Sequence, residues 1–225
     1  MKPFKYFLLF LFLISMQINL QAQPSASLYF TTAFPIGEFR DFVPSTGFGS
    51  TTEYFFFTPS KKTPYGVGLN FSYVAYGLRF VNDPYDNELS LSFNKANNFA
   101  SMHILFQVGS YSGSVRPYLE TLFGGSYIFS NTEIGYDYYD RFSLWIDDWA
   151  WSYGVGAGIK LLSIGDAYFN RGSVYIDLKV RYLFGTTTSY LDRESISLYY
   201  DTIEYSLIES KTDMLTASIG LYFFL

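Results

Sequence analysis

The stretch "SVYIDLKVRYLFG" at residues 173–185 alternates between apolar and other side chains, and it carries three charges. Successive side chains of a β-strand point to opposite faces, so this period of two predicts a strand. One face holds Val174, Ile176, Leu178, Val180, Tyr182 and Phe184; the other holds Tyr175, Asp177, Lys179, Arg181, Leu183 and Gly185. In a soluble protein the apolar face packs inward, whereas in a membrane-spanning barrel it faces lipid. The fold is therefore decided by which face is the inner one.

The N-terminal segment has the organisation of a secretory signal peptide. Lys2 and Lys5 precede an apolar run that extends from Tyr6 to Ile14, and Ala22 ends the polar stretch that follows. The apolar run is shorter than the roughly 20 residues that a membrane-spanning helix requires. We therefore expect residues 1–22 to be a cleaved signal peptide and residues 23–225 to form a single domain.

Composition excludes several classes of function. The chain has no cysteine, which rules out disulfides and thiolate metal sites, and with a single histidine we expect neither zinc nor any cofactor. The formal net charge of −5 argues against nucleic-acid binding. Aromatic residues make up 22% of the chain, which together with 18 glycines favours many alternating strands.

Eight segments of the chain alternate in this way. They are residues 25–34, 47–58, 65–80, 99–110, 115–129, 149–162, 173–185 and 213–225. The long links 35–46, 81–98, 130–148 and 186–212 alternate with the short links 59–64, 111–114 and 163–172. In an up-and-down barrel this order places every long loop at one end and every short turn at the other, as in outer-membrane barrels. The sequence therefore predicts an all-β fold, an eight-stranded antiparallel up-and-down transmembrane β-barrel.

A secreted lipocalin-like barrel is the competing interpretation, because it would turn the apolar face inward around a ligand. Glycine and serine share the charged face, which suits a narrow interior, while bulky aromatic side chains occupy the other face. These aromatic side chains gather near strand ends, where the interfacial girdle of a membrane barrel is expected. The total of 15 lysines and arginines is also low for a polar soluble surface. These features favour the membrane barrel.

Several motifs resemble those of small outer-membrane barrels. They are "PIGEF" (35–39), "RPYLETLFGGSYIF" (116–129), "YGVGAGIK" (153–160), "VYIDLKVRYLFGTTTSYL" (174–191) and the aromatic last strand. The mature chain is similar to the OmpA/OmpX-like family of eight-stranded outer-membrane barrel proteins. This resemblance implies a monomer surrounded by the lipid of a Gram-negative outer membrane and inserted by the outer-membrane assembly machinery. Last strands in that family usually end in Phe, whereas this chain ends Phe224-Leu225. The family is functionally diverse, so the resemblance implies no particular activity.

Seven ionisable side chains fall on the face that carries the small residues. They are Glu53, His103, Glu120, Lys160, Asp177, Lys179 and Arg181. Buried charges persist only when they are paired, and an eight-stranded barrel is just wide enough to be filled by side chains. We therefore predict an ion-pair cluster that plugs the lumen. The alternative is a gated ion path through a breakable pair.

His103 shares its face with Ser101, and a serine–histidine pair could carry out the acyl chemistry of a lipid-modifying enzyme. This pair points inward and no carboxylate is placed to orient the histidine, so we predict no catalytic residue and no enzyme.

The long links are acidic and rich in tyrosine, which provides large contact areas at low cost in entropy. The candidates for surface recognition are Tyr136, Tyr138, Tyr139, Trp145, Tyr199 and Tyr200. The predicted role is structural or surface-interacting, with an unidentified surface ligand. A narrow channel, a lipid-modifying enzyme and a secreted lipocalin-like protein are the alternatives.

Overall fold

The computed structural model describes residues 23–43, 45–81, 93–137, 140–191, 197–199 and 202–225. The predicted signal peptide lies outside these ranges and stays a prediction. Among the residues that the structure describes, no helix is both long and apolar enough to cross a membrane.

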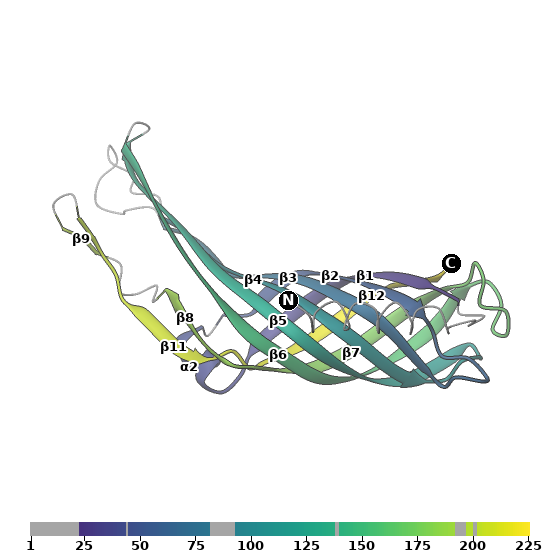
Figure 1. The fold of residues 1–225 in the computed structure, drawn as a ribbon. Helices are drawn as coiled ribbons and strands as arrows, with labels where there is room; N and C mark the ends of the chain where they lie inside the picture. The colour runs from purple at the N-terminus through teal and green to yellow at the C-terminus, as the bar shows by residue number, and fades with distance from the viewer. Residues whose placement is uncertain (1–22, 44, 82–92, 138–139, 192–196, 200–201) are drawn as a thin grey trace, which may run out of the picture.

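Eight strands form a closed barrel in which each strand is antiparallel to its neighbours (Figure 1). They are β1 (Ser25–Pro35), β2 (Gly47–Phe57), β3 (Tyr65–Val81), β4 (Phe93–Gly109), β5 (Val115–Asp137), β6 (Asp140–Ile164), β7 (Val174–Gly185) and β12 (Met214–Phe224). The strands follow chain order around the barrel, and β12 closes against β1, where Ser25 pairs with Phe224. None of these eight strands is therefore left as a free edge. The predicted eight-stranded up-and-down barrel is confirmed.

The burial of β7 shows which face is inside. Asp177 is fully buried, and Lys179 and Arg181 are 3% and 4% exposed, whereas Val180 on the other face is 49% exposed. The charges of residues 173–185 thus face the barrel interior and the apolar side chains face outward. This burial confirms the inverted assignment of the two faces. It contradicts the lipocalin-like alternative, whose interior would be apolar.

Three strands are longer than the alternation predicted. β4 begins at Phe93, β5 continues to Asp137 and β6 begins at Asp140, so most of the predicted loop 130–148 is paired strand. The β5–β6 hairpin extends well past the ends of β1, β2, β7 and β12 in Figure 1. The predicted loops 81–98 and 130–148 were therefore drawn too long. The alternation of apolar and polar side chains fades in these extensions, although their backbones remain paired. Backbone pairing does not require such alternation, so the sequence gives no sign of it.

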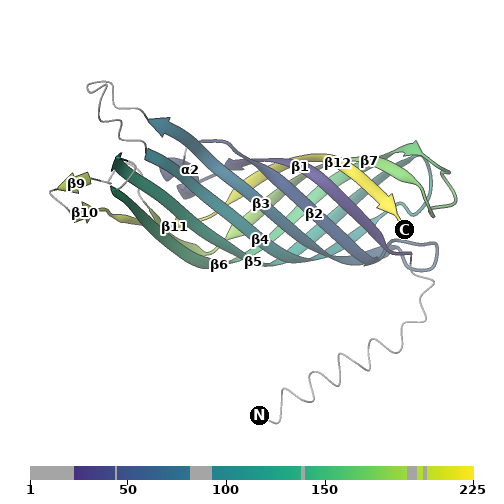
Figure 2. The same ribbon diagram turned by 90° about the horizontal axis from the view of Figure 1, so that it is seen from above.

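The long link between β7 and β12 contains four short strands. They are β8 (Thr187–Leu191), β9 (Ser197–Tyr199), β10 (Thr202–Glu204) and β11 (Leu207–Lys211). β8 pairs with β11, and β9 pairs with β10. The link between β1 and β2 contains helix α2 (Glu38–Phe42), which the sequence did not predict because five residues are too few to show a helical period. Figure 2 shows α2, β9, β10 and β11 at the barrel end opposite the C-terminus.

The extension of β5 and β6 can be tested by amide hydrogen exchange. We expect the amides of residues 128–131 and 145–148 to exchange at least about ten times more slowly than those of Lys61 and Lys62, which lie in a short link. Residues 128–131 and 145–148 belong to paired strands, whose hydrogen bonds protect their amides. Mass spectrometry of peptic fragments gives both rates in one experiment. Equal rates would contradict the extended hairpin.

Candidate functional site

Glu53 of β2 lies in the barrel interior, where its side chain is fully buried. Lys179 Nζ lies 2.8 Å from Oε1 and 2.7 Å from Oε2 of this carboxylate, and the Arg181 guanidinium forms an ion pair with it. Asn70 donates a further hydrogen bond from Nδ2 over 3.1 Å. These donors replace the water that the carboxylate loses on burial, which offsets its desolvation.

Arg181 also contacts a second carboxylate. Its Nε lies 2.5 Å from Glu120 Oε1 on β5, so one guanidinium connects acids from two separate strands. Gly156 leaves room for this pair, because a Cβ there would lie 2.8 Å from Arg181 Cγ and 3.1 Å from Glu120 Oε1. Glu53, Glu120, Lys179 and Arg181 are called the central ion-pair cluster below.

Asp177 and Lys160 lie outside the central ion-pair cluster, although the sequence grouped them with it. Asp177 accepts hydrogen bonds from Tyr29 Oη at 2.8 Å and from Tyr118 Oη at 2.7 Å. Lys160 donates to Gln107 Oε1 over 2.7 Å. No ion pair among the described residues includes either side chain. Both charges are instead held by neutral polar partners.

Aromatic rings surround the Lys160 ammonium. Its Nζ lies 3.7 Å from the ring centroid of Tyr222, 4.7 Å from that of Tyr118 and 5.6 Å from that of Phe55. The negative faces of such rings attract a cation, and the attraction is strongest where water is excluded. This arrangement stabilises the Lys160 charge without a carboxylate in contact.

His103 of β4 points into the barrel and is 1% exposed. Within the described chain neither ring nitrogen has a hydrogen-bond partner, so no bond joins it to Ser101 on the same face. Nucleophilic catalysis requires a base within hydrogen-bond reach of the nucleophile. The geometry therefore provides no assembled serine–histidine pair. No group of three or more His, Cys, Asp or Glu side chains that could hold a metal occurs among the described residues.

The sequence missed the neutral partners of the charges, namely Tyr29, Asn70, Gln107 and Tyr118. Each lies on the inward face of its strand, and this parity is readable from the sequence. Parity shows which face of its strand a residue lies on, but it does not show the position of that residue along the barrel axis relative to residues of other strands. This position depends on the stagger between strands, so parity could not assign these partners.

Aromatic contacts lie at both ends of the polar interior. At the end that carries α2, the Phe39 ring packs edge-on against Tyr76 at 5.6 Å and Tyr190 at 5.8 Å, and Phe39 is 2% exposed. At the other end the Arg116 guanidinium lies 4.5 Å from the ring of Tyr175 and 5.2 Å from that of Phe224.

Backbone carbonyl groups fix Arg116 in this position. Its Nη2 donates to Ala167 O at 2.9 Å and its Nε to Gly113 O at 3.0 Å. The guanidinium thus joins the barrel wall to two of the short links.

Asp148 of β6 holds β8 against the barrel wall. Its Oδ2 accepts hydrogen bonds from the Ser189 backbone N–H and the Thr188 hydroxyl, both at 2.8 Å. The Ser189 hydrogen bond is the main cause that lowers the pKa of Asp148 from its ordinary value of 3.8.

The predicted recognition residues are only partly described. Trp145 is 54% exposed, and its Nε1 donates to Asp147 Oδ1 over 3.0 Å. Tyr136 belongs to β5 and Tyr199 to β9. Tyr138, Tyr139 and Tyr200 lie outside the described residues.

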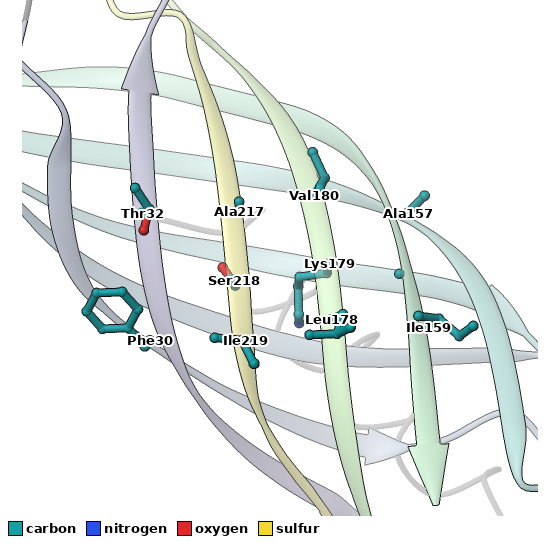
Figure 3. Close-up of a pocket in the computed structure, with 11 residues that line it drawn as sticks. Phe30, Thr32, Ala157, Ile159, Leu178, Lys179, Val180, Ala217, Ser218 and Ile219 are labelled. Carbon is teal, nitrogen blue, oxygen red and sulfur yellow. The ribbon is translucent and has the colours of Figure 1, made fainter.

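A shallow hollow of about 700 Å³ lies on the outer face of β1, β12, β7 and β6 (Figure 3). The paired residues Thr32 and Ala217, together with Ala157, place small side chains there, next to the bulkier Phe30 and Ile219. The outward-facing side chains that line it carry no ionisable group, so we assign no chemistry to this hollow.

These features define a closed eight-stranded antiparallel barrel with an apolar exterior and a charged interior. The structure is similar to the N-terminal β-barrel domain of Pseudomonas aeruginosa OprF, with 13% identity and a TM-score of 0.40 over 90% of this chain and 100% of that chain. It is also similar to Ail, the attachment invasion locus protein of Yersinia pestis, with 14% identity and a TM-score of 0.46 over 91% and 100%. For Neisserial surface protein A the identity is 9% and the TM-score 0.43 over 90% and 96%. No family model matches the sequence, and the comparison with curated proteins gives no significant match.

Neutralising Glu53 tests the central ion-pair cluster. We expect Glu53→Gln to lower the free energy of unfolding by about 3–5 kcal/mol, because it leaves a buried cation without its partner. Adding Lys179→Met should recover part of this loss by removing that cation. Urea unfolding in detergent micelles, followed by tryptophan fluorescence, measures both changes.

Glu209→Gln on the exposed face of β11 is the matched control, and it should leave the unfolding midpoint unchanged. The cluster would be unimportant for stability if Glu53→Gln unfolded at the wild-type urea concentration.

The contact between Asp148 and β8 should depend on pH. Because the folded-state pKa lies below 3.8, the hydrogen bonds hold above that pH and weaken as the pH falls through the lowered pKa. We expect the Ser189 amide proton shift, measured by NMR, to titrate below pH 3.8. Asp148→Asn should abolish this titration, whereas Asp147→Asn should preserve it. A Ser189 shift that is independent of pH in the wild-type protein would refute the contact.

Proposed function

We propose that this protein is an integral outer-membrane barrel. Its filled polar lumen stabilises the fold, and its outer strands and loops bind a ligand at the cell surface. The apolar exterior carries this proposal. Leu28, Phe30, Ile104, Leu119 and Phe123 are 55–66% exposed, and they point away from the barrel interior. An apolar surface that encircles the molecule is unfavourable in water, whereas lipid satisfies it.

The order of the links and the predicted signal peptide support an outer-membrane location. The short links adjoin the ends of β1 and β12, and the long links with α2 and β8–β11 lie at the opposite end. Outer-membrane barrels keep their short turns and termini on the periplasmic side. The long β5–β6 hairpin would then extend outward from the cell surface.

Two features favour a filled lumen over an open path. Arg181 connects Glu53 with Glu120 inside the barrel, and each of these ion pairs is buried. Aromatic contacts around Phe39 and Arg116 lie at the two ends of this polar interior. Breaking the ion pairs to open a path would leave buried charges unpaired, which is costly.

The β5–β6 hairpin supports the surface-interaction part of the proposal. Its exposed Trp145 lies beside Asp147, so an aromatic face and a carboxylate are presented together. Aromatic side chains of this kind provide contact area at low cost in conformational entropy.

A charge placed on the outward face tests the membrane proposal. We expect Leu119→Arg to lower stability by about 2–4 kcal/mol in lipid bilayers, because a cation near the bilayer centre is poorly solvated. Leu207→Arg on β11 is the control, since Leu207 is similarly exposed but lies outside the barrel wall. Unfolding by guanidinium in vesicles measures both variants. Equal stabilities would contradict a lipid-facing position for Leu119.

Fractionation of expressing cells provides the direct test of location. The protein should enter the outer-membrane fraction, and unheated samples should migrate differently from boiled samples on gels because the closed barrel resists detergent. Recovery in the soluble fraction without any shift on heating would overturn the proposal.

A further inference from the structure

Four aromatic side chains form a contiguous surface on the outward face of β3, β5 and β6. They are Tyr73, Tyr127, Phe129 and Trp145, called the outer aromatic platform below. The rings of Phe129 and Trp145 are stacked, with centroids 5.2 Å apart and an interplanar angle of 18°. Tyr127 lies 5.6 Å and Tyr73 lies 6.5 Å from the same phenylalanine ring. Phe129 therefore contacts the other three rings.

Polar groups fix the edges of these rings. Asp147 accepts hydrogen bonds from Tyr127 Oη at 2.7 Å and from Trp145 Nε1 at 3.0 Å. Tyr73 donates its hydroxyl hydrogen to Asn98 Oδ1 over 2.6 Å. Tyr73 and Trp145 nevertheless stay 44% and 54% exposed. The platform is thus held in one geometry while it still presents ring surface to its surroundings, which lowers the entropic cost of binding.

The strand lengths place the β5 and β6 members of this platform beyond the lipid-facing part of the barrel. A transmembrane strand needs about 9–11 residues, which on β5 extends from Val115 to about Gly125. Phe129 lies past that point, and Trp145 pairs with Asn131 further along the same hairpin. The platform continues the outward face that carries Phe123 and Trp151, which are stacked at 5.8 Å. Phe129 and Trp145 therefore stand at the level of the lipid headgroups, and Tyr73, the ninth residue of β3, lies at the outer boundary of the lipid-facing wall.

The chemistry of the platform selects sugar over phosphate. The face of an aromatic ring is negative, so it attracts the weakly positive C–H bonds on the flat face of a pyranose ring. Carboxylate and amide oxygens beside the rings accept hydrogen bonds from sugar hydroxyls. Asp147, which contacts two of these rings, repels a phosphate group at the same place.

We propose that the outer aromatic platform binds uncharged sugar rings in the headgroups of glycolipids that surround the barrel. This inference rests on the membrane location proposed above. It assigns the surface interaction to a lipid class in the same membrane, and it identifies Trp145 and Phe129 as the stacking residues.

Trp145 can report on this contact directly. The chain has three tryptophans, so Trp149→Phe and Trp151→Phe together leave Trp145 as the single emitter. This reporter is placed in nanodiscs of phosphatidylcholine, with or without monogalactosyl diacylglycerol. We expect the galactolipid to shift emission to shorter wavelength and to lower the acrylamide quenching constant about twofold or more, because a stacked sugar covers the indole face that Phe129 leaves free.

Two variants of the reporter separate the platform from the lipid-facing belt. Phe129→Ala removes the ring stacked on Trp145 and should abolish the response to galactolipid. Phe123→Ala removes an aromatic ring of the same size lower on β5 and should leave the response intact. Equal responses of the two variants would overturn the assignment to the platform.

Exchanging the galactolipid for an anionic lipid or a free sugar tests whether the response requires a sugar headgroup in the membrane. Anionic phosphatidylglycerol in place of galactolipid should cause no change, and neither should free methyl galactoside at the same sugar concentration. The inference is overturned if galactolipid has no effect, if phosphatidylglycerol has the same effect, or if free sugar suffices. A reporter that fails to insert, as shown by the absence of heat-dependent gel mobility, would contradict the membrane location itself and the platform with it.

Discussion

Glu53 keeps a negative charge inside the barrel, where Lys179 and Arg181 contact it from β7. The attraction is favourable only at contact distance, and an unpaired charge in the same place would cost several kcal/mol. The two strands must therefore keep the stagger around the barrel that brings these groups together. A slip of one residue in β7 would turn Asp177, Lys179 and Arg181 outward, because the side-chain period of a strand is two. The ion pairs and the strand register thus specify each other.

The same period explains how a chain that is 49% hydrophobic can enclose charges. Each strand separates its side chains into two sets, and barrel closure assigns one set to the narrow interior. Glycine at position 156 supplies the space that the Arg181–Glu120 pair needs. Many aromatic side chains, among them Phe30, Phe123 and Trp151, take the outer set, where ring surface is favourable next to lipid and at its boundary, whereas Tyr118 and Tyr222 line the interior. Beyond that boundary Phe129 and Trp145 still stack on each other, so the aromatic surface extends further along the strands than the lipid-facing part of the barrel.

The sequence contained enough information for the strands and their faces, because alternation over ten or more residues is hard to obtain in any other structure. It placed Glu53, Glu120, Lys179 and Arg181 on the inner face but could not assign their partners. The neutral partners of Asp177 and Lys160, among them Tyr118 and Gln107, depend on the stagger between strands, which alternation does not encode. The outer parts of β5 and β6 were missed because their pairing continues where the alternation fades. Helix α2 was too short to be recognised.

The pairing of Ser25 with Phe224 has a consequence for the order of folding. Among the eight barrel strands, β12 leaves the ribosome last and its partner β1 leaves first. Contacts between such distant parts of a chain form slowly, because a long loop must close before they are gained. Until then the sheet keeps two open edges and an apolar outer face, both of which promote aggregation. The unfinished sheet must therefore be shielded from other chains until β12 reaches β1.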